Sequence, residues 1–464
     1  MTTGVEDAGA AAAYATASDP ELMKAILERH LRMGDGSPVR IDACEVAFAR
    51  QGESRSLFQY RVDLRDPAGG PARALEITAV AYGPKRGPRA WDRVRRRLAE
   101  RATDPSDLVP AAYVPDLDLL VQVFPFDHQM PALSRMVAQP WPPVAEPLLA
   151  SFGPGDWHVA GWNAEIVRYR VDLRATVHLR LRAEDAAAGR IAERRAYAKI
   201  YGNASLAERA CQVQRDLAAA MASGDGSLGI APVLAWLPEH SVLVQGEVAG
   251  ASLADVVDDD RSNVAAVQQV ARALAALHLL PVAAPPQSHE LERSGADRAR
   301  RSAQRIRRAR PDLAPQVDDV EEAILSRFAV LGDPPERPVH GDLKPAHALL
   351  DGDRVVFLDF DKFAAGDPML DVVSMARGIG NNRPKGLAPD GGGLADAFVE
   401  AYFARVPIDW RARLGPNYAA ALLADASKLD RKVRDQAGRN RRDRQTDRAA
   451  MLLADARAIL AATR

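Results

Sequence analysis

The sequence predicts an α+β fold, with strand-rich segments in the first half of the chain and helices in the second. Two series of apolar, turn-bounded segments lie before residue 250. From about residue 251 onward, apolar residues recur at helical spacing, as in VAAVQQVARALAALHLL. One hairpin pattern interrupts these helices, within the stretch VHGDLKPAHALLDGDRVVFLDFDK at 339–362.

Composition indicates an ordinary globular protein. The chain has 464 residues, of which 47% are hydrophobic, and a formal net charge of −1, so we expect neither a nucleic-acid nor a membrane partner. Its two cysteines make no disulfide framework or zinc cluster. No run of uncharged apolar residues is long enough to predict a membrane span. The N-terminus carries acidic residues where a signal peptide has basic ones. We therefore expect a cytoplasmic protein, of an oligomeric state that the sequence does not indicate.

The first strand-rich series predicts an N-terminal module over 18–150. Residues 1–17 are Ala-rich and predict a disordered lead. Ser18 or Asp19 can cap a helix that has Pro20 in its first turn. Strand patterns follow at 43–51, 56–65, 74–83 and 117–126, with a helical pattern at 91–102.

A second series with the same order of elements occupies 151–250. The pairs AYG (81–83) and IYG (200–202), and LLVQ (119–122) and VLVQ (242–245), echo one another. The first module is therefore either a degenerate copy of the second, or a chance likeness between strands of similar composition. Aligning the copies puts Lys199 opposite Val80, within an apolar strand. Such a lysine is either solvated at a sheet edge or reaches a phosphate.

The hairpin pattern gathers three polar side chains. A turn at Gly352-Asp353 pairs Leu350 with Val355 and carries His347 to the same open end as Asp359. The loop that contains Asp342 leaves from that end. Two carboxylates at a strand end suit phosphoryl transfer, in which one accepts a hydroxyl proton and the other holds a metal ion. Alternatively, these aspartates only cap a loop and end a strand.

Several motifs resemble the aminoglycoside phosphotransferase and choline-kinase-like family. They are HGDLKP (340–345), LDFD (358–361), GDP (366–368) with Asp371, and LAALH (274–278). The resemblance covers roughly 155–464. It implies a protein-kinase-like bilobal fold, with a small antiparallel-sheet N-lobe at 151–250, a helical C-lobe at 251–464 and an extra N-terminal α/β module. The implied activity is ATP-dependent phosphorylation of a hydroxyl on a small molecule, such as a sugar, an amino alcohol or an antibiotic-like compound.

The resemblance also implies roles for individual residues. Asp342 matches the catalytic base, and Lys344 a lysine near the transferred phosphate. Asp359 matches the metal-binding aspartate, with Asp361 as a helper. The backbone of 245–248, which includes Gln245 and Glu247, matches the hinge that holds adenine. Lys199 matches the lysine that pairs with nucleotide phosphates, and the implied cofactors are ATP and Mg²⁺.

Two departures from the family pattern leave alternatives open. His347 stands where asparagine is usual, and imidazole suits Mn²⁺ better than Mg²⁺. It is a metal ligand, a ligand through water or only a hydrogen-bonding group in the loop. Gln212 stands where a glutamate normally anchors the strand lysine, although Glu208, one turn earlier, could substitute. Both departures favour the alternative function, a pseudokinase that binds nucleotide or acts as a scaffold with little turnover.

An arginine-rich helical segment precedes the hairpin. Residues 293–310 hold eight arginines and one acid, and Arg298, Arg301, Arg305 and Arg308 share one helix face. This face is either solvated surface or a contact for an anionic substrate or partner. In the resembled fold this region helps to build the acceptor pocket, which would argue against a polycationic aminoglycoside. RNA binding through this face remains a third alternative.

Overall fold

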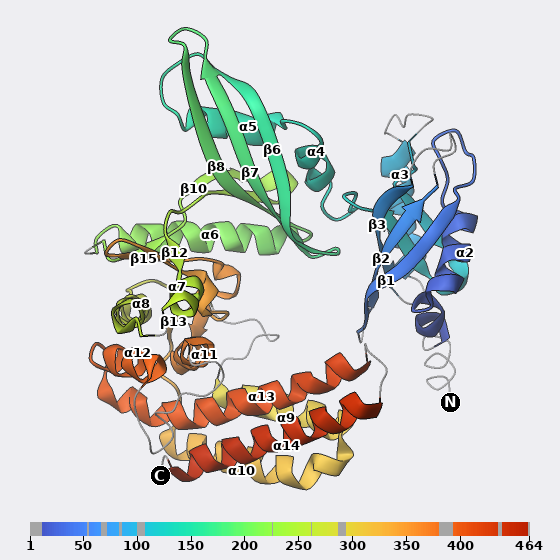
Figure 1. Ribbon diagram of the computed structural model, residues 1–464. Helices are drawn as coiled ribbons and strands as arrows, with labels where there is room; N and C mark the ends of the chain where they lie inside the picture. The colour runs from blue at the N-terminus through green and yellow to red at the C-terminus, as the bar shows by residue number, and fades with distance from the viewer. Residues whose placement is uncertain are drawn as a thin grey trace. The chain divides into compact units, whose positions relative to one another are not determined.

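The computed structural model describes residues 12–52, 55–65, 72–82, 86–99, 107–224, 226–260, 262–285, 294–379, 393–434 and 439–462, with side chains left undescribed over 430–447. The chain forms two compact units (Figure 1). Unit 1 comprises Met1–Ala207 and Leu234–Gln245, and unit 2 comprises Glu208–Val233 and Gly246–Arg464. Among the described residues, no helix combines the length and apolar character needed to cross a bilayer.

Unit 1 begins with helix α2 and a five-stranded antiparallel sheet. Asp19 is the cap of α2, because its side chain accepts the backbone N–H groups of Glu21 and Leu22. The sheet has the order β1-β2-β3-β5-β4, with α2 packed beside β1 and β4, and α3 beside β4 and β5. The elements are α2 (Pro20–His30), β1 (Ile41–Gln51), β2 (Ser56–Leu64), β3 (Arg73–Ala81), α3 (Arg86–Ala99), β4 (Ala111–Val114) and β5 (Leu119–Val123).

A second five-stranded sheet completes unit 1. Its order is β10-β11-β8-β7-β6, and β7 pairs antiparallel with both β6 and β8 along nearly their full lengths. Helices α4 and α5 cover one face of this sheet (Figure 1). The elements are α4 (Ala132–Ala138), α5 (Pro142–Ala150), β6 (Trp157–Arg170), β7 (Arg174–Asp185), β8 (Arg190–Tyr201), β10 (Val233–Leu237) and β11 (Val242–Gly246).

The two sheets have the same strand order. If β1, β2 and β3 are matched with β6, β7 and β8, then β5 matches β11 and β4 matches β10 at the far edge. The helix between the third and fourth strands also recurs, as α3 in one copy and α6 (Ala204–Met221) in the other. This common order supports the inference that the N-terminal module is a degenerate copy, which remains a prediction.

Two boundaries differ from those predicted. Residues 12–17 are helical, with Ala17 buried and Tyr14 against Phe58, so the disordered lead predicted over 1–17 is wrong for these six; residues 1–11 lie outside the described residues. Residues 130–150 were assigned to the N-terminal module, yet Met130 and Leu148 belong to the core of the second sheet. Sequence periodicity identifies the apolar face of a helix but not the sheet that will cover it.

Unit 2 is mostly helical. Its helices share one large apolar core, in which α9 packs on α10 and α13, and α13 packs on α14 (Figure 1). The helices are α7 (Leu253–Asp259), α8 (Val264–Leu279), α9 (Gly295–Ala309), α10 (Ala314–Leu331), α11 (Met369–Ile379), α12 (Leu394–Phe403), α13 (Leu414–Arg434) and α14 (Arg439–Ala462). Helix α6 crosses from unit 1 into unit 2 after Ala207.

Unit 2 also has two small sheets, and the four-stranded one contains the predicted hairpin. Its strands pair Leu349 with Val356 and Leu350 with Val355, and the Leu358 N–H donates to the carbonyl oxygen of His347 at 2.9 Å. Gly352 adopts a φ of 58° in the turn, so the predicted register and turn are confirmed. The sheets are β12-β14-β15-β9 and β13-β16, built from β9 (Leu228–Ile230), β12 (Ala251–Ser252), β13 (Arg337–Val339), β14 (Ala348–Asp351), β15 (Arg354–Phe357) and β16 (Ala364–Gly366).

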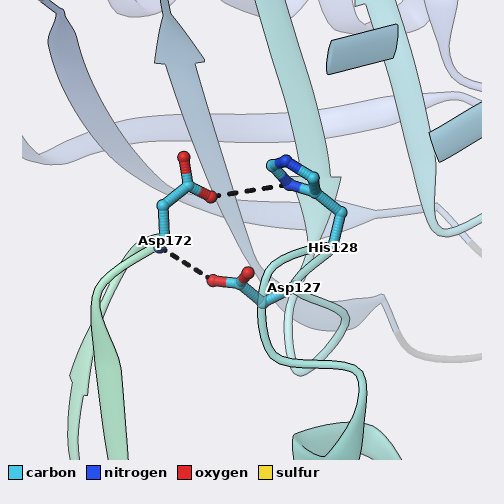
Figure 2. Close-up of side chains that lie close together, drawn as sticks. All are labelled: Asp127, His128 and Asp172. Atoms are coloured by element: carbon cyan, nitrogen blue, oxygen red, sulfur yellow. Dashed lines mark hydrogen bonds and ion pairs between the residues drawn. The ribbon is translucent and has the colours of Figure 1, made fainter. Parts of the chain in front are cut away.

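A buried polar network in unit 1 joins the segment after β5 to the β6–β7 turn (Figure 2). The Asp127 carboxylate accepts the backbone N–H groups of Gln129, Met130 and Asp172, and the hydroxyl of Tyr169. These four donors offset the desolvation of a side chain that is only 1% exposed. The network therefore holds the connection between the two sheets in place.

We predict that Asp127→Ala destabilises the protein strongly, because it leaves four donors without their acceptor. The expected loss is about 3 kcal/mol of the free energy of unfolding, measured by urea denaturation. Asp63→Ala is the control, since Asp63 is exposed on β2, and it should change stability by less than about 0.5 kcal/mol. Equal stability of the two variants would contradict the importance of the network.

Candidate active site

The loop after β13 places Asp342 at the surface of a cavity. Gly341 has a φ of 78°, and a Cβ on it would lie 2.6 Å from the carbonyl oxygen of Lys362, so only glycine fits there. The Lys362 Nζ donates to Asp342 Oδ1 at 2.8 Å. Both side chains line a cavity of about 350 Å³ within unit 2. The cavity is large enough for a small molecule to reach the Asp342 carboxylate.

His340 joins the Asp342 loop to the end of β15. Its buried ring donates from Nε2 to the carbonyl oxygen of Leu358 at 2.7 Å and accepts the Asp342 N–H at Nδ1, at 3.3 Å. The carbonyl oxygen can only accept and the amide can only donate, so these partners assign a neutral ring with its proton on Nε2. One imidazole therefore sets the spacing between the backbone at Asp342 and the residue before Asp359.

His347 makes a second connection between the Asp342 loop and Asp359. Its Nδ1 donates to the Asp342 carbonyl oxygen at 3.0 Å, and its Nε2 lies 4.0 Å from Asp359 Oδ2. Burial, together with the positive charge of the nearby Lys344, lowers the pKa of His347 to about 4. The ring is therefore neutral at pH 7, and its Nε2 directs a lone pair toward the Asp359 carboxylate.

Asp359 follows β15 in the left-handed backbone region, with a φ of 68° and a ψ of 55°. This conformation costs free energy for most residues, but aspartate tolerates it better than others, and it occurs often at functional sites. The turn leads into a short 3-10 helix, Phe360–Lys362, which carries Asp361, half-buried. Lys344 lies in the loop between Asp342 and His347 and is exposed.

The buried carboxylate of Asp371 holds the loop that contains Asp342. Asp371 on α11 accepts the backbone N–H groups of His340 at 2.6 Å and Gly341 at 3.0 Å. His278 on α8 contacts Asp371 through Nε2 at 3.3 Å and the hydroxyl of Tyr402 through Nδ1 at 2.7 Å. Burial raises the pKa of Asp371, but the hydrogen bonds from His278 and from the backbone outweigh it and hold the pKa below its usual value.

The structure thus brings Asp342, His347 and Asp359 together, as the hairpin register predicted. Sequence reasoning missed Lys362, whose ion pair with Asp342 depends on the direction of the 3-10 turn after Asp359. It also missed Arg209 on α6, whose guanidinium donates to the Phe363 carbonyl oxygen at 3.1 Å. The DFDK motif contained the only signal for Lys362, a lysine three residues after Asp359.

The predicted nucleotide-binding residues are divided between the units. Lys199 lies half-buried in β8 and Gln245 is buried at the end of β11, both in unit 1. Glu247 is exposed just after the point where unit 1 ends and unit 2 begins, in the predicted hinge. On α6, Gln212 is exposed and donates to Asp216 of its own helix, and Glu208 is exposed one turn earlier. Their contact with Lys199 remains a prediction.

Asp127, His128 and Asp172 form a separate group of potential metal ligands in unit 1 (Figure 2). Burial raises the pKa of both carboxyl groups and lowers the pKa of His128 to about 4. The oxygens of Asp127 are occupied by N–H and O–H donors, and Asp172 Oδ2 binds Arg55 at 3.3 Å and the hydroxyl of Tyr82. Since Arg55 already supplies a cation, this group is best explained as a structural network.

Comparison with known proteins gives a family. A profile described as the phosphotransferase enzyme family matches residues 170–415. No curated protein sequence matches the chain. Among solved structures, the fold is similar to a choline/ethanolamine kinase family protein from Mesorhizobium loti, with 19% identity, a TM-score of 0.43, and coverage of 66% of this chain and 93% of that one.

Two other solved structures show a similar level of likeness. An ADP-bound aminoglycoside phosphotransferase has 12% identity and a TM-score of 0.41, covering 64% of this chain and 92% of that one. An ethanolamine kinase from Plasmodium vivax has 11% identity and a TM-score of 0.40, with coverage of 63% and 81%. The profile match spans more than half of the chain and includes both aspartates of the hairpin site. The chain therefore belongs to the phosphotransferase enzyme family.

Proposed function

We propose that the protein transfers the γ-phosphoryl group of ATP to a hydroxyl of a small-molecule acceptor. The observation that carries this proposal is that Asp342 and Asp359 lie at one end of the hairpin, connected through the imidazoles of His340 and His347. Phosphoryl transfer depends on positioned carboxylates more than on covalent chemistry by the protein. A cavity beside Asp342 provides space for the acceptor.

The donors around Asp359 fit a divalent cation. The Asp359 carboxylate supplies oxygen, and the bare Nε2 of His347 lies 4.0 Å from it, close enough for both to share one ion. Asp361 is the further candidate ligand on the same turn. Magnesium or manganese bound there would neutralise charge on the nucleotide phosphates.

Asp342 is the proposed catalytic base. Its carboxylate would accept the proton of the acceptor hydroxyl as that oxygen bonds to the γ-phosphorus and ADP leaves. Lys362 holds the carboxylate in place before the acceptor arrives. Lys344 and Lys199 are proposed to stabilise phosphate charge, and the backbone near Gln245 and Glu247 to bind adenine.

Asp342→Asn should lower the rate of phosphoryl transfer about 10²- to 10⁴-fold, because an amide cannot accept the hydroxyl proton. The measurement is ADP release during a screen of sugars, amino alcohols and antibiotics. Asp353→Asn is the matched control, since Asp353 is exposed at the tip of the same hairpin and should retain the wild-type rate.

Background rates that are equal in the wild type and in Asp342→Asn would favour the alternative, a pseudokinase. In that case nucleotide should still bind, which equilibrium binding of ATP to both proteins would show.

His347→Asn should change the metal preference of the reaction. Replacing imidazole by an amide oxygen favours the harder ion, so we expect the ratio of Mn²⁺-supported to Mg²⁺-supported kcat to fall roughly three- to tenfold. Titrating each metal at saturating ATP measures this ratio. An unchanged ratio would indicate that His347 only supports the Asp342 loop through its Nδ1 hydrogen bond.

A further inference from the structure

The cavity beside Asp342 has a positively charged wall. Helix α9 supplies Arg298, Arg301 and Arg305 to its lining, and the Asp342 loop, α11 and α13 supply much of the rest. The arginines lie three and four residues apart, so they share one face of the helix. Arg298 and Arg301 are half-buried, and Arg305 is exposed. The structure thus places this face against the same cavity as the proposed catalytic base.

The carboxylates that line the cavity are already matched by donors. Asp425 pairs with Arg377 and with Lys428, and Asp342 pairs with Lys362. Asp371 is buried and accepts two backbone N–H groups of the catalytic loop. The described lining has six cationic side chains and three carboxylates, so the arginines of α9 determine the sign of its net charge.

Two other arginines of α9, Arg300 and Arg307, face elsewhere. Arg307 forms ion pairs with Asp318 and Glu321 of α10. Arg300 Nη1 lies 3.7 Å from Oδ1 of Asp297 on its own helix. Neither residue lines the cavity. Arg307 is thus paired with acids of α10, whereas Arg298, Arg301 and Arg305 line the space in which the acceptor would bind.

We propose that the acceptor is a small anionic alcohol, a compound that carries both a hydroxyl and a phosphate or carboxylate group. This inference rests on the proposed phosphotransferase function and adds the charge of its substrate. Guanidinium groups bind such oxyanions through paired hydrogen bonds, while a cationic acceptor would be repelled by the lining. A volume of about 350 Å³ suits a molecule of sugar-phosphate size.

The first test compares matched acceptors. Glycerol, glycerol 3-phosphate and glycerate form one set, and glucose, glucose 6-phosphate and gluconate another, with choline and kanamycin as cationic compounds. At least one anionic member should have a kcat/KM at least tenfold above that of its neutral parent. The phosphate and carboxylate members distinguish the two kinds of anion. Equal or better use of neutral or cationic acceptors would overturn the inference while leaving the phosphotransferase function intact.

The second test uses variants of α9. The double variant Arg301→Gln, Arg305→Gln should raise the KM for the preferred anionic acceptor at least tenfold and reduce the preference over the neutral parent. The control is Arg300→Gln, Arg308→Gln, which removes the same charge from residues of the same helix that do not line the cavity. Thermal unfolding verifies that both variants fold. Equal KM values for the two variants would contradict a role for the basic wall.

A binding measurement separates the two proposals. With the nucleotide site saturated by Mg²⁺ and ADP, calorimetry should show an anionic compound of the panel binding at least tenfold more tightly than its neutral parent, and more weakly as salt increases. If no acceptor supports turnover above that of Asp342→Asn, the proposed function fails, but this measurement still decides the charge preference of the cavity. No preference for anions here would overturn the inference.

Discussion

The geometry of the candidate active site depends on the two hydrogen bonds of the His340 ring. They tie the Asp342 amide to the Leu358 carbonyl oxygen, and thereby the loop after β13 to the end of β15. His347 adds a parallel connection from the Asp342 carbonyl oxygen to the neighbourhood of Asp359. Both rings therefore hold the Asp342 loop through backbone groups, while Lys362 holds the Asp342 carboxylate separately. Such preorganisation is what phosphoryl transfer requires of a protein.

The helices of unit 2 bury Asp371, the carboxylate that holds the Asp342 loop. A carboxylate as buried as Asp371 is stable only when donors surround it. Here the donors are backbone N–H groups of the Asp342 loop and His278 on α8. His278 is in turn bound by Tyr402 on α12. Asp371 therefore links α8, α11 and α12 to the catalytic loop. The LAALH motif contributes through its buried His278, which contacts Asp371.

Much of the site could be predicted from the sequence because it depends on local pairing. A hairpin with a two-residue turn has one register, and that register places His347 and Asp359 together. Features that depend on distant partners were not predicted. The strand β4 has only four residues, and its extended conformation depends on pairing with β5. Helices α4 and α5 could have covered either sheet, and they pack on the second. The Lys362–Asp342 ion pair likewise depends on a turn whose direction no residue pattern specifies.

The arginines of α9 show how structure separates interpretations that a charge pattern cannot. From the sequence, this helix could be solvated surface, which its charge pattern favours, or a contact for an anion. The packing against α10 and α13 divides its basic residues, since Arg307 is matched by acids of α10 while Arg301 and Arg305 line the cavity with Asp342. The proposed base and these arginines share one cavity, so the cations beside it are the groups that we propose to select the charge of the acceptor.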